Sequence, residues 1–395
     1  MIFCKNTNTA LFFSAIDEVP SQIWDALGCK KNSYFHPNFL KSLEKNHPKI
    51  IFSYIVLVDH KKQPTAFASI KIIDFHADSI KKGFPFLINI GRKLRVFPAK
   101  KPLKLLICGN TFVSGEHGVF INKKQNKNAI VKELAESINH FVNSNKKLKK
   151  QIDAFLLKDY AQESLSITSE LKKFNYHAFS VEPNMKLELQ KDWQTFDDYL
   201  AAMKTKFRVK ARKAFTLSVQ LRIEEVTLKN IDQKLPKMTA LYEKVASNAG
   251  FNLVDFNLET YKDLKEKLGE NYILKTYWLD DEIVGFISGI VNNGSLDAHF
   301  VGIDYQLNKS HAIYQRMLYT YVEIAIEKKL KTVNFGRTAS EIKSSVGAVP
   351  QDLTMYLRHK KTIKNRILKL FLQRVQPTAF QQKFPFKNVI NPHEK

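Results

Sequence analysis

The sequence is poor in cysteine, glycine and proline. Its three cysteines among 395 residues show no CxxC spacing, which argues against both a zinc site and a disulfide framework. The 14 glycines and 13 prolines are too few for a collagen-like or linker-rich chain. No apolar run reaches the roughly 18 residues of a membrane-spanning helix, and the run at 10–13 is too short for a signal peptide. We therefore expect a cytoplasmic protein without bound metal, associated with a membrane at most peripherally.

Acidic residues are also scarce, with 38 Asp and Glu against 62 Lys and Arg, a net charge of +24. Such a chain attracts anions: nucleic acid, phosphorylated ligands, an acidic carrier protein or an anionic membrane surface. The sequence has no zinc finger, RNP1 motif or clear helix-turn-helix, so sequence-specific DNA binding is not expected. It also lacks a Walker A motif, GxGxxG and GxSxG, which leaves ATP hydrolysis, dinucleotide redox chemistry and serine-hydrolase chemistry without support.

The chain does have the composition of folded domains, with 44% apolar residues, 25% charged residues and 29 phenylalanines. Three strands, a helix and a further strand are predicted in the same order twice. The first set is expected at 52–58, 65–73, 103–108, 127–145 and 152–157. The second set is expected at 272–278, 283–291, 295–303, 310–328 and 332–335. This order favours a tandem duplication of one α/β unit with a mixed sheet, and two unrelated α/β domains are the alternative.

The domain boundaries follow from this repeat. We expect an N-terminal domain at 1–180, with a basic insertion at 77–104, and a C-terminal domain at 181–357. A basic amphipathic tail is expected at 358–395. The stretches 81–104 and 358–374 mix basic with apolar residues, as do segments that lie in a membrane interface. Binding to RNA or to an acidic carrier protein, or plain packing on the body of the protein, are the alternatives.

Four segments resemble a known family. They contain Trp24-Asp25-Ala26-Leu27 with His36-Pro37-Asn38-Phe39-Leu40, Gly109-Asn110-Thr111 with Ser114-Gly115-Glu116-His117-Gly118, Glu182-Pro183-Asn184-Met185 ahead of the basic stretch 204–213, and Asn334-Phe335-Gly336-Arg337-Thr338. With these segments in this order, the sequence is similar to the FemAB-like (Fem-type) branch of the GNAT N-acyltransferase superfamily.

The resemblance implies an α/β fold of two tandem GNAT-like acyl-CoA N-acyltransferase domains. It implies a transferase that moves an acyl or aminoacyl group from an activated carrier to an amine acceptor, with no bound cofactor. The carrier would be acyl-CoA, an acyl carrier protein or an aminoacyl-tRNA. A non-catalytic GNAT-like binding module and a membrane-surface scaffold are the alternatives, because one copy of a duplicated GNAT unit often loses its site.

Candidate catalytic residues lie on and after the predicted strand at 295–303. Asp297 and His299 are two residues apart, so they share one face of the strand, where a carboxylate beside a neutral imidazole can deprotonate an amine. The resemblance adds Tyr314, because many GNAT enzymes use a tyrosine to protonate the departing thiolate. The structural alternatives are a hydrogen-bonded Asp–His pair and a core tyrosine.

The donor phosphates are expected at Asn308, Lys309, Ser310 and His311. By the resemblance, this segment occupies the place of a glycine-containing phosphate loop ahead of a helix. Both glycines are missing here, although Lys309 and His311 can supply positive charge. A plain helix start capped by Asn308 or Ser310 is the alternative.

Arg337 is the predicted anchor for an anionic substrate. It follows the strand at 332–335, and strand ends of this kind open into the ligand crevice of an α/β sheet. Glu341 and Lys343 follow on the same loop, and the resemblance adds Asn184. An ion pair between Arg337 and Glu341 is the structural alternative.

The stretch 203–213 has six basic residues and no acidic one. Lys204, Arg208 and Arg212 recur at four-residue spacing, so they form one row on a helix, which we interpret as a site for the anionic donor. A solvated surface is the alternative.

We expect direct transfer without a covalent enzyme intermediate. The amine proton passes to Asp297, His299 or water, and backbone N–H groups hold the oxyanion where the central strands separate.

Overall fold

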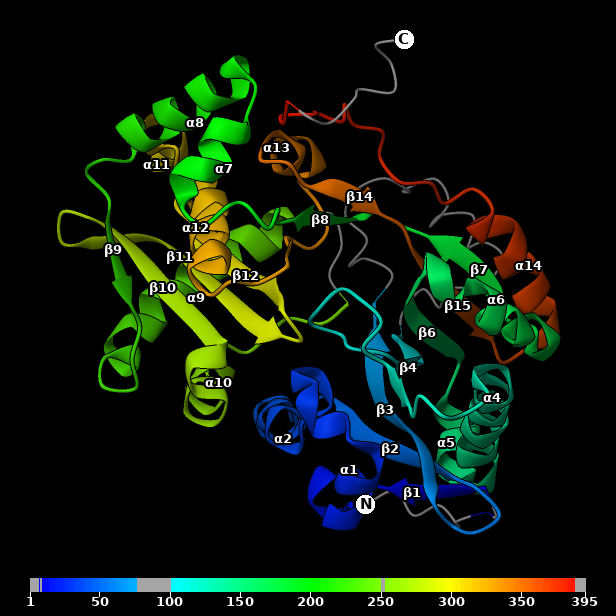
Figure 1. The fold of residues 1–395 in the computed structure, drawn as a ribbon. Helices are drawn as coiled ribbons and strands as arrows, with labels where there is room; N and C mark the ends of the chain where they lie inside the picture. Colours follow the sequence, from blue (N-terminus) through cyan, green and yellow to red (C-terminus); the bar gives the residue numbers. More distant parts are fainter. Residues whose placement is uncertain (1–6, 8, 77–100, 250–252, 388–395) are drawn as a thin grey trace. The chain divides into compact units, whose positions relative to one another are not determined.

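The computed structural model describes residue 7 and residues 9–76, 101–249 and 253–387, which form two compact units (Figure 1). Unit 1 is built from 1–181, 249–257 and 352–377, and unit 2 from 182–248, 258–351 and 378–395. Apart from 101–104, the basic insertion lies outside the described residues, so the membrane contact expected at 81–104 stays a prediction. Among the helices of the described ranges, none is long and apolar enough to cross a bilayer.

Within the described residues, the sheet of unit 1 has eight strands in the order β1-β2-β3-β4-β6-β15-β7, with β5 paired to β3. The strands are β1 (Ala10–Phe13), β2 (Ile51–Val58), β3 (Pro64–Phe75), β4 (Leu103–Cys108), β5 (Val119–Ile121), β6 (Ala154–Ala161), β7 (His177–Ser180) and β15 (Leu353–His359). The helices are α1 (Ser21–Leu27), α2 (Pro37–Asn46), α4 (Lys127–Ser144), α5 (Lys146–Gln151), α6 (Leu165–Thr168) and α14 (Thr362–Leu372). Of the described strand pairs in this sheet, only β4 and β6 run parallel.

Helices cover both faces of this sheet, which explains why β2 and β3 are almost continuously buried. On one face, α4 begins at the Asn126 cap and buries a stripe at helical spacing that includes Ile130, Leu134 and Ile138. On the other face, the Trp24 ring of α1 lies 4.9 Å from the Phe67 ring of β3.

The sheet of unit 2 has seven strands in the order β14-β8-β13-β12-β11-β10-β9. The strands are β8 (Asn184–Glu188), β9 (Arg222–Glu225), β10 (Tyr272–Leu279), β11 (Glu282–Asn292), β12 (Ser295–Ile303), β13 (Thr332–Asn334) and β14 (Val349–Gln351). The helices are α7 (Phe196–Ala202), α8 (Thr205–Leu217), α9 (Ile231–Asn248), α10 (Thr260–Leu268), α11 (Tyr305–His311), α12 (Ile313–Glu327) and α13 (Ser340–Ser345). Within this sheet, β12 and β13 form the parallel pair among the described strands.

Two glycines show how closely helices pack on the two faces of the second sheet. A Cβ atom at Gly285 would run into Met317 of α12, whereas a Cβ atom at Gly302 would run into Leu241 of α9. Gly285 pairs with Ile303 and Phe286 with Gly302, so the two glycines lie on opposite faces. The helix α12 therefore covers one face of the sheet and α9 the other.

The two units repeat one topology, as predicted. In unit 1 the sequence β2-β3-β4-α4-β6 ends in the parallel pair β4/β6, and in unit 2 β10-β11-β12-α11-α12-β13 ends in the pair β12/β13. In each sheet, the strand beside this pair comes from elsewhere in the sequence. β15 lies between β6 and β7, and β8 lies between β13 and β14. The sequence analysis ended the C-terminal domain at 357 and began the tail at 358, whereas β15 at 353–359 pairs with strands of unit 1.

The single helix expected at 310–328 is two helices. The chain forms α11 at 305–311, reverses at Ala312, whose φ is 46°, and continues as α12 from 313. The prediction of an uninterrupted helix was therefore wrong. Nothing in the local sequence indicates that the backbone of Ala312 lies in the left-handed region.

Candidate functional site

The central strands of unit 2 separate at one point. β12 pairs with β13 only over Ser295–Asp297 and Thr332–Asn334. β12 then continues, whereas the chain after Asn334 turns away through Gly336, whose φ of 72° favours glycine. The end of a parallel pair in an open α/β sheet is where ligands reach the backbone. The sequence analysis placed its candidate residues on both sides of this point.

A β-bulge lies on β12 at the same place. His299 and Phe300 together oppose Ser288 of β11, because the strand register shifts there. The Ser288 hydroxyl donates to the Phe300 carbonyl at 2.9 Å and accepts from the Phe300 amide at 3.0 Å. The Tyr261 hydroxyl contacts the same Ser288 oxygen at 3.1 Å. Bulges beside active sites commonly re-aim a side chain, and this one is held by a dedicated serine.

Four polar side chains, two buried and two half-buried, cross four strands beside the separation point. We call Asp297, Asn334, Asn184 and Gln351 the polar row. Asp297 Oδ1 accepts from Asn334 Nδ2 at 2.9 Å and also from Ser295 Oγ at 2.9 Å. Asn184 Nδ2 donates to Asn334 Oδ1 at 2.7 Å and to Gln351 Oε1 at 3.3 Å. The structure therefore joins Asp297 and Asn184, two of the predicted site residues, in one network that fixes the carboxylate.

His299 and Tyr314 lie on different elements of unit 2. The His299 ring is 4.3 Å from the Phe300 ring and 6.3 Å from the Tyr261 ring, on the bulge. Tyr314 is in the first turn of α12, where burial raises the pKa of its hydroxyl above the ordinary value. That hydroxyl is therefore protonated at neutral pH, the form that a proton donor needs. The catalytic roles of both residues stay predictions.

The predicted phosphate-binding residues do not begin a helix. Asp304 caps α11, with its carboxylate accepting from the Gln306 amide at 2.9 Å, so residues 308–311 form the end of that helix. Asn308 Oδ1 accepts from the Tyr314 amide at 2.9 Å and thereby caps α12. The alternative reading, a helix that starts with Asn308 or Ser310 as its cap, is wrong as well, because both residues lie within α11. Phosphate binding at this segment stays a prediction.

The loop after β13 is held by a buried lysine. Gly336, Thr338 and Ala339 all have positive φ, at 72°, 69° and 49°. The Lys343 ammonium donates to the Arg337 carbonyl at 2.7 Å and to the Gly336 carbonyl at 3.3 Å. Burial lowers the pKa of Lys343 to about 7. Lys343 therefore shapes the loop from which the predicted anchor Arg337 projects.

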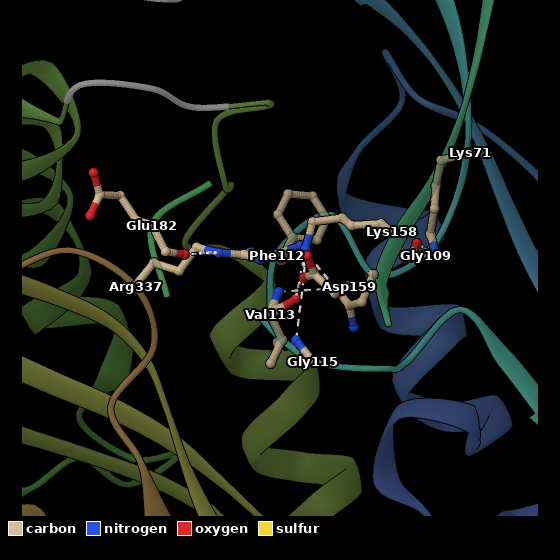
Figure 2. Close-up of polar contacts among 10 residues, drawn as sticks. Lys71, Gly109, Phe112, Val113, Gly115, Lys158, Asp159, Glu182 and Arg337 are labelled. Atoms are coloured by element: carbon tan, nitrogen blue, oxygen red, sulfur yellow. Dashed lines mark hydrogen bonds and ion pairs between the residues drawn. The ribbon is translucent and has the colours of Figure 1, made fainter. Parts of the chain in front are cut away.

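Arg337 and Glu341, the two other residues predicted in this part of the chain, each contact another group of unit 2. Arg337 Nε donates to the Glu182 carbonyl at 2.9 Å (Figure 2). The Glu341 carboxylate pairs with Lys383 at 3.1 Å. The Arg337 guanidinium has further N–H groups, which can bind a substrate anion while Nε keeps its contact with the Glu182 carbonyl. Anion binding at Arg337 stays a prediction.

The buried lysines predict a pH dependence of stability. Burial lowers the pKa of both Lys71 and Lys343 from 10.5 to about 7, so between these values the unfolded chain binds more protons than the folded chain. The free energy of unfolding should therefore rise with pH across this window, by up to about 1.4 kcal/mol per pH unit for each lysine. Lys343→Met should reduce that slope in urea unfolding measured from pH 7 to 10. The exposed control Lys210→Met should leave it unchanged, and an unchanged slope in Lys343→Met would contradict the assignment.

A groove of about 710 Å³ opens in unit 2 between α8, α13 and the segment 378–387, which we call the C-terminal strap. It is lined by Lys206, Phe207, Lys210, Ala339, Ser340, Glu341, Ile342, Ser345, Phe380 and Lys383. Backbone hydrogen bonds fix the strap on both sides. The Lys204 amide donates to the Pro385 carbonyl at 2.7 Å, and the Lys383 amide donates to Ser344 Oγ at 3.1 Å. Three lysines and one glutamate give the groove a net positive charge.

The basic helix α8 carries two rows of charge. Lys206 and Lys210 line the groove. The row chosen from the sequence, Lys204, Arg208 and Arg212, lies half a turn away, because residues in a helix advance about 100° each. Arg208 bonds the Met203 carbonyl at 3.5 Å. The sequence could not distinguish these rows, since both have four-residue spacing and flank the same buried alanines.

The groove and the polar row lie on opposite faces of the second sheet. Leu296, Val333 and Met185 share a core cluster with the buried side of α8 and with α12. The neighbouring residues Asp297, Asn334 and Asn184 alternate with them along the same strands and so point to the other face. The point where β12 separates from β13 lies between the groove and the polar row.

Unit 1 has a charged cluster that the sequence analysis did not identify (Figure 2). Lys158 and Asp159 are both buried on β6, just beyond its pairing with β4, and form an ion pair. Lys158 Nζ also donates to the Val113 carbonyl at 3.3 Å, and Asp159 Oδ2 accepts from the Gly115 amide at 3.2 Å. The pair thus binds the loop 109–118, whose glycine motif was noticed in the sequence without a role.

The backbone at this pair is irregular. Lys158 and Asp159 together oppose Met355 of β15, so β6 carries a bulge, and Asp159 has a φ of 67°. A Cβ atom at Gly109 would overlap the Lys158 side chain, which explains the glycine at the start of the loop. On β3, the buried Lys71 donates to Ser69 Oγ at 2.7 Å and to the Gly109 carbonyl at 2.9 Å. Among the described residues, no group of three or more His, Cys, Asp or Glu side chains is placed to hold a metal ion.

Comparison with known proteins extends these observations. The FemAB-like family, described as peptidoglycan biosynthesis/recognition, matches residues 104–388. The solved structure of FemX is similar, with a TM-score of 0.52 and 13% identity over 86% of this chain and 96% of that chain. Among curated proteins, none matches the sequence.

Two further solved structures are similar over most of their length. A tandem GNAT protein from the clavulanic acid biosynthesis pathway has a TM-score of 0.49 and 9% identity, covering 89% of this chain and 98% of that chain. The C-terminal domain of a putative lysylphosphatidylglycerol synthetase from Agrobacterium fabrum has a TM-score of 0.49 and 8% identity, covering 88% and 94%. The family match and the likeness to FemX confirm the resemblance and the tandem α/β fold predicted from the sequence.

Proposed function

Because the chain belongs to the FemAB-like family, a branch of the GNAT-fold acyltransferases, we propose that unit 2 moves an acyl or aminoacyl group from an anionic carrier to an amine. The observation that carries this proposal is the separation of β12 from β13 beside the fixed Asp297 carboxylate. Acyl-CoA, an acyl carrier protein and an aminoacyl-tRNA all present a phosphate-bearing carrier to such a site.

The carrier binds in the groove on the α8 side. Lys206 and Lys210 attract its phosphates, whereas Lys383 of the strap is paired with Glu341. Phe207 and Ile342 give the groove apolar surface for the uncharged part of the carrier. From there, the activated acyl group reaches the gap between β12 and β13, and the amine approaches from the side of the polar row.

The reaction is a direct acyl transfer. The amine nitrogen attacks the carbonyl carbon, a C–N bond forms, and the bond from that carbon to the carrier oxygen or sulfur breaks. The amine proton passes to Asp297, whose carboxylate is held by Asn334 and Ser295. Backbone N–H groups of β12 beyond the pairing with β13 stabilise the oxyanion. The leaving oxygen or sulfur takes a proton from Tyr314 or from water.

Substitution of the two groove lysines should show which of the two basic rows of α8 binds the carrier. Lys206→Ala with Lys210→Ala should raise KM for the carrier roughly three- to tenfold, because two exposed charges that contact phosphate each contribute up to about 1 kcal/mol. The effect should shrink at high salt. Initial rates at varied donor concentration give the measurement.

The other row provides the matched comparison. Arg208→Ala with Arg212→Ala removes the same charge from the same helix and should change KM by less than the groove pair. If the arginine pair has the larger effect, the carrier follows the row predicted from sequence and the groove assignment is wrong.

A further inference from the structure

The last helix of unit 1, α14, has one packed face and one open face. Asn365, Leu368 and Leu372 are buried, and Asn365 fixes the helix by accepting from the His359 amide at 2.8 Å and donating to the Asn175 carbonyl at 2.9 Å. In Figure 1 the helix lies beside β7 and β15. Because these contacts hold one side of α14 against unit 1, the opposite side of the helix faces outward.

Large aliphatic side chains point outward from that opposite side. Ile363 is 76% exposed and Leu370 is 62% exposed, and their seven-residue spacing places them on one line along the helix. Arg366 of the helix is exposed as well, and so is Arg374 just beyond the end of the helix. An exposed isoleucine and leucine in one line are costly in water unless something covers them.

The surroundings of these two side chains are strongly basic. Residues 360–376 contain Lys360, Lys361, Lys364, Arg366, Lys369 and Arg374 and no acidic residue. The neighbouring helix α5 adds Lys146, Lys147, Lys149 and Lys150, and the Lys360 ammonium donates to the Lys149 carbonyl at 2.6 Å. The nearby Asp153 carboxylate accepts from the Lys104 amide at 3.1 Å. The face therefore combines aliphatic tips with a broad positive field.

We propose that α14 docks on the surface of an anionic lipid bilayer, with Ile363 and Leu370 inserted among the acyl chains and the basic residues on the headgroups. This is the composition of an interfacial amphipathic helix. Single-stranded nucleic acid is bound by aromatic stacking, and the outward line of α14 has aliphatic residues instead. The inference does not depend on the proposed acyl transfer, and it gives a place at a membrane to a chain whose described helices do not cross one.

Flotation of the full chain with vesicles tests the proposal. Vesicles of equal parts phosphatidylglycerol and phosphatidylcholine should bind the protein, and vesicles of phosphatidylcholine alone should bind it at least about tenfold less. Ile363→Ser with Leu370→Ser should weaken binding to the anionic vesicles about tenfold or more. Arg366→Glu with Arg374→Glu should do the same, and high salt should weaken binding of the wild type.

Leu228→Ser, at a leucine that is 50% exposed in unit 2, is the matched control and should bind like the wild type. Circular dichroism of each variant shows whether the fold is kept, and the exposed positions make loss of the fold unexpected. Wild-type binding by the Ile363/Leu370 variant would overturn the proposal, as would equal binding to both kinds of vesicle. Binding to an RNA oligonucleotide without binding to anionic vesicles would also overturn it.

Discussion

Asp159→Asn should lower the free energy of unfolding of this protein by about 3–5 kcal/mol, because it leaves the buried Lys158 ammonium without its carboxylate. Asparagine keeps the size of the side chain and tolerates the positive φ of 67° at this position, so lost charge dominates the effect. The midpoint of urea or thermal unfolding, followed by circular dichroism, measures it.

Lys158→Met removes the other charge of the pair and should lower the free energy of unfolding by a similar amount. The double variant, with both charges removed, should lose less than the sum of the two single variants, because neither charge is then left unpaired. If the two losses simply add, or if each is below about 1 kcal/mol, the two charges do not stabilise each other and this account of unit 1 is wrong.

Asp297→Asn should reduce the rate of acyl transfer by about 10²- to 10⁴-fold, the range expected for loss of a general base. The side chain keeps its size and one oxygen that Asn334 can still bond, so the fold should be unaffected. The rate should fall in kcat, with KM for the carrier nearly constant, because the carrier groove lies on the other face of the sheet.

Ser295→Ala removes the second hydrogen bond to the Asp297 carboxylate and provides the comparison. Its effect should be smaller, because the bond from Asn334 remains. A rate in Asp297→Asn within a factor of about two of the wild type would exclude Asp297 as the base. His299→Ala, measured in parallel, then shows whether the imidazole on the bulge has that role.

Much of the fold could be predicted from the sequence, because its strands are bounded by strong local signals. The strand at 295–303 begins after the Asn293-Gly294 turn, where both residues have positive φ, and ends at the Asp304 cap. The strand at 103–108 was likewise predicted with its observed bounds. The duplicated order of elements followed from these signals alone.

Strand exchange between the repeats could not be predicted in this way. The segment 353–359 was not predicted as a strand, and only its long-range pairing with β6 and β7 assigns it to unit 1. The break at Ala312 is similar, because the left-handed turn is held by contacts such as the Asn308 cap of α12. Such contacts are not visible in local periodicity.

The candidate site was predicted in part. Asp297, Asn184 and Arg337 lie around one strand separation, and their roles stay predictions. The Lys158–Asp159 pair was missed because adjacent charges in a strand place one on each face, and only the bulge buries both. The signal was present, since this pair interrupts the apolar run of β6 while the glycine motif at 109–118 follows its parallel neighbour β4.

Single-turnover transfer from a set of labelled donors tests the central claim most directly. Acyl-CoA, an acylated carrier protein and aminoacyl-tRNA, each carrying a labelled acyl group, are mixed with the full chain and a panel of primary amines. The account predicts that at least one donor yields a labelled amide and that mass spectrometry finds no label bound to the protein. Label attached covalently to the chain, or no transfer from any donor to any amine in the panel, would contradict it.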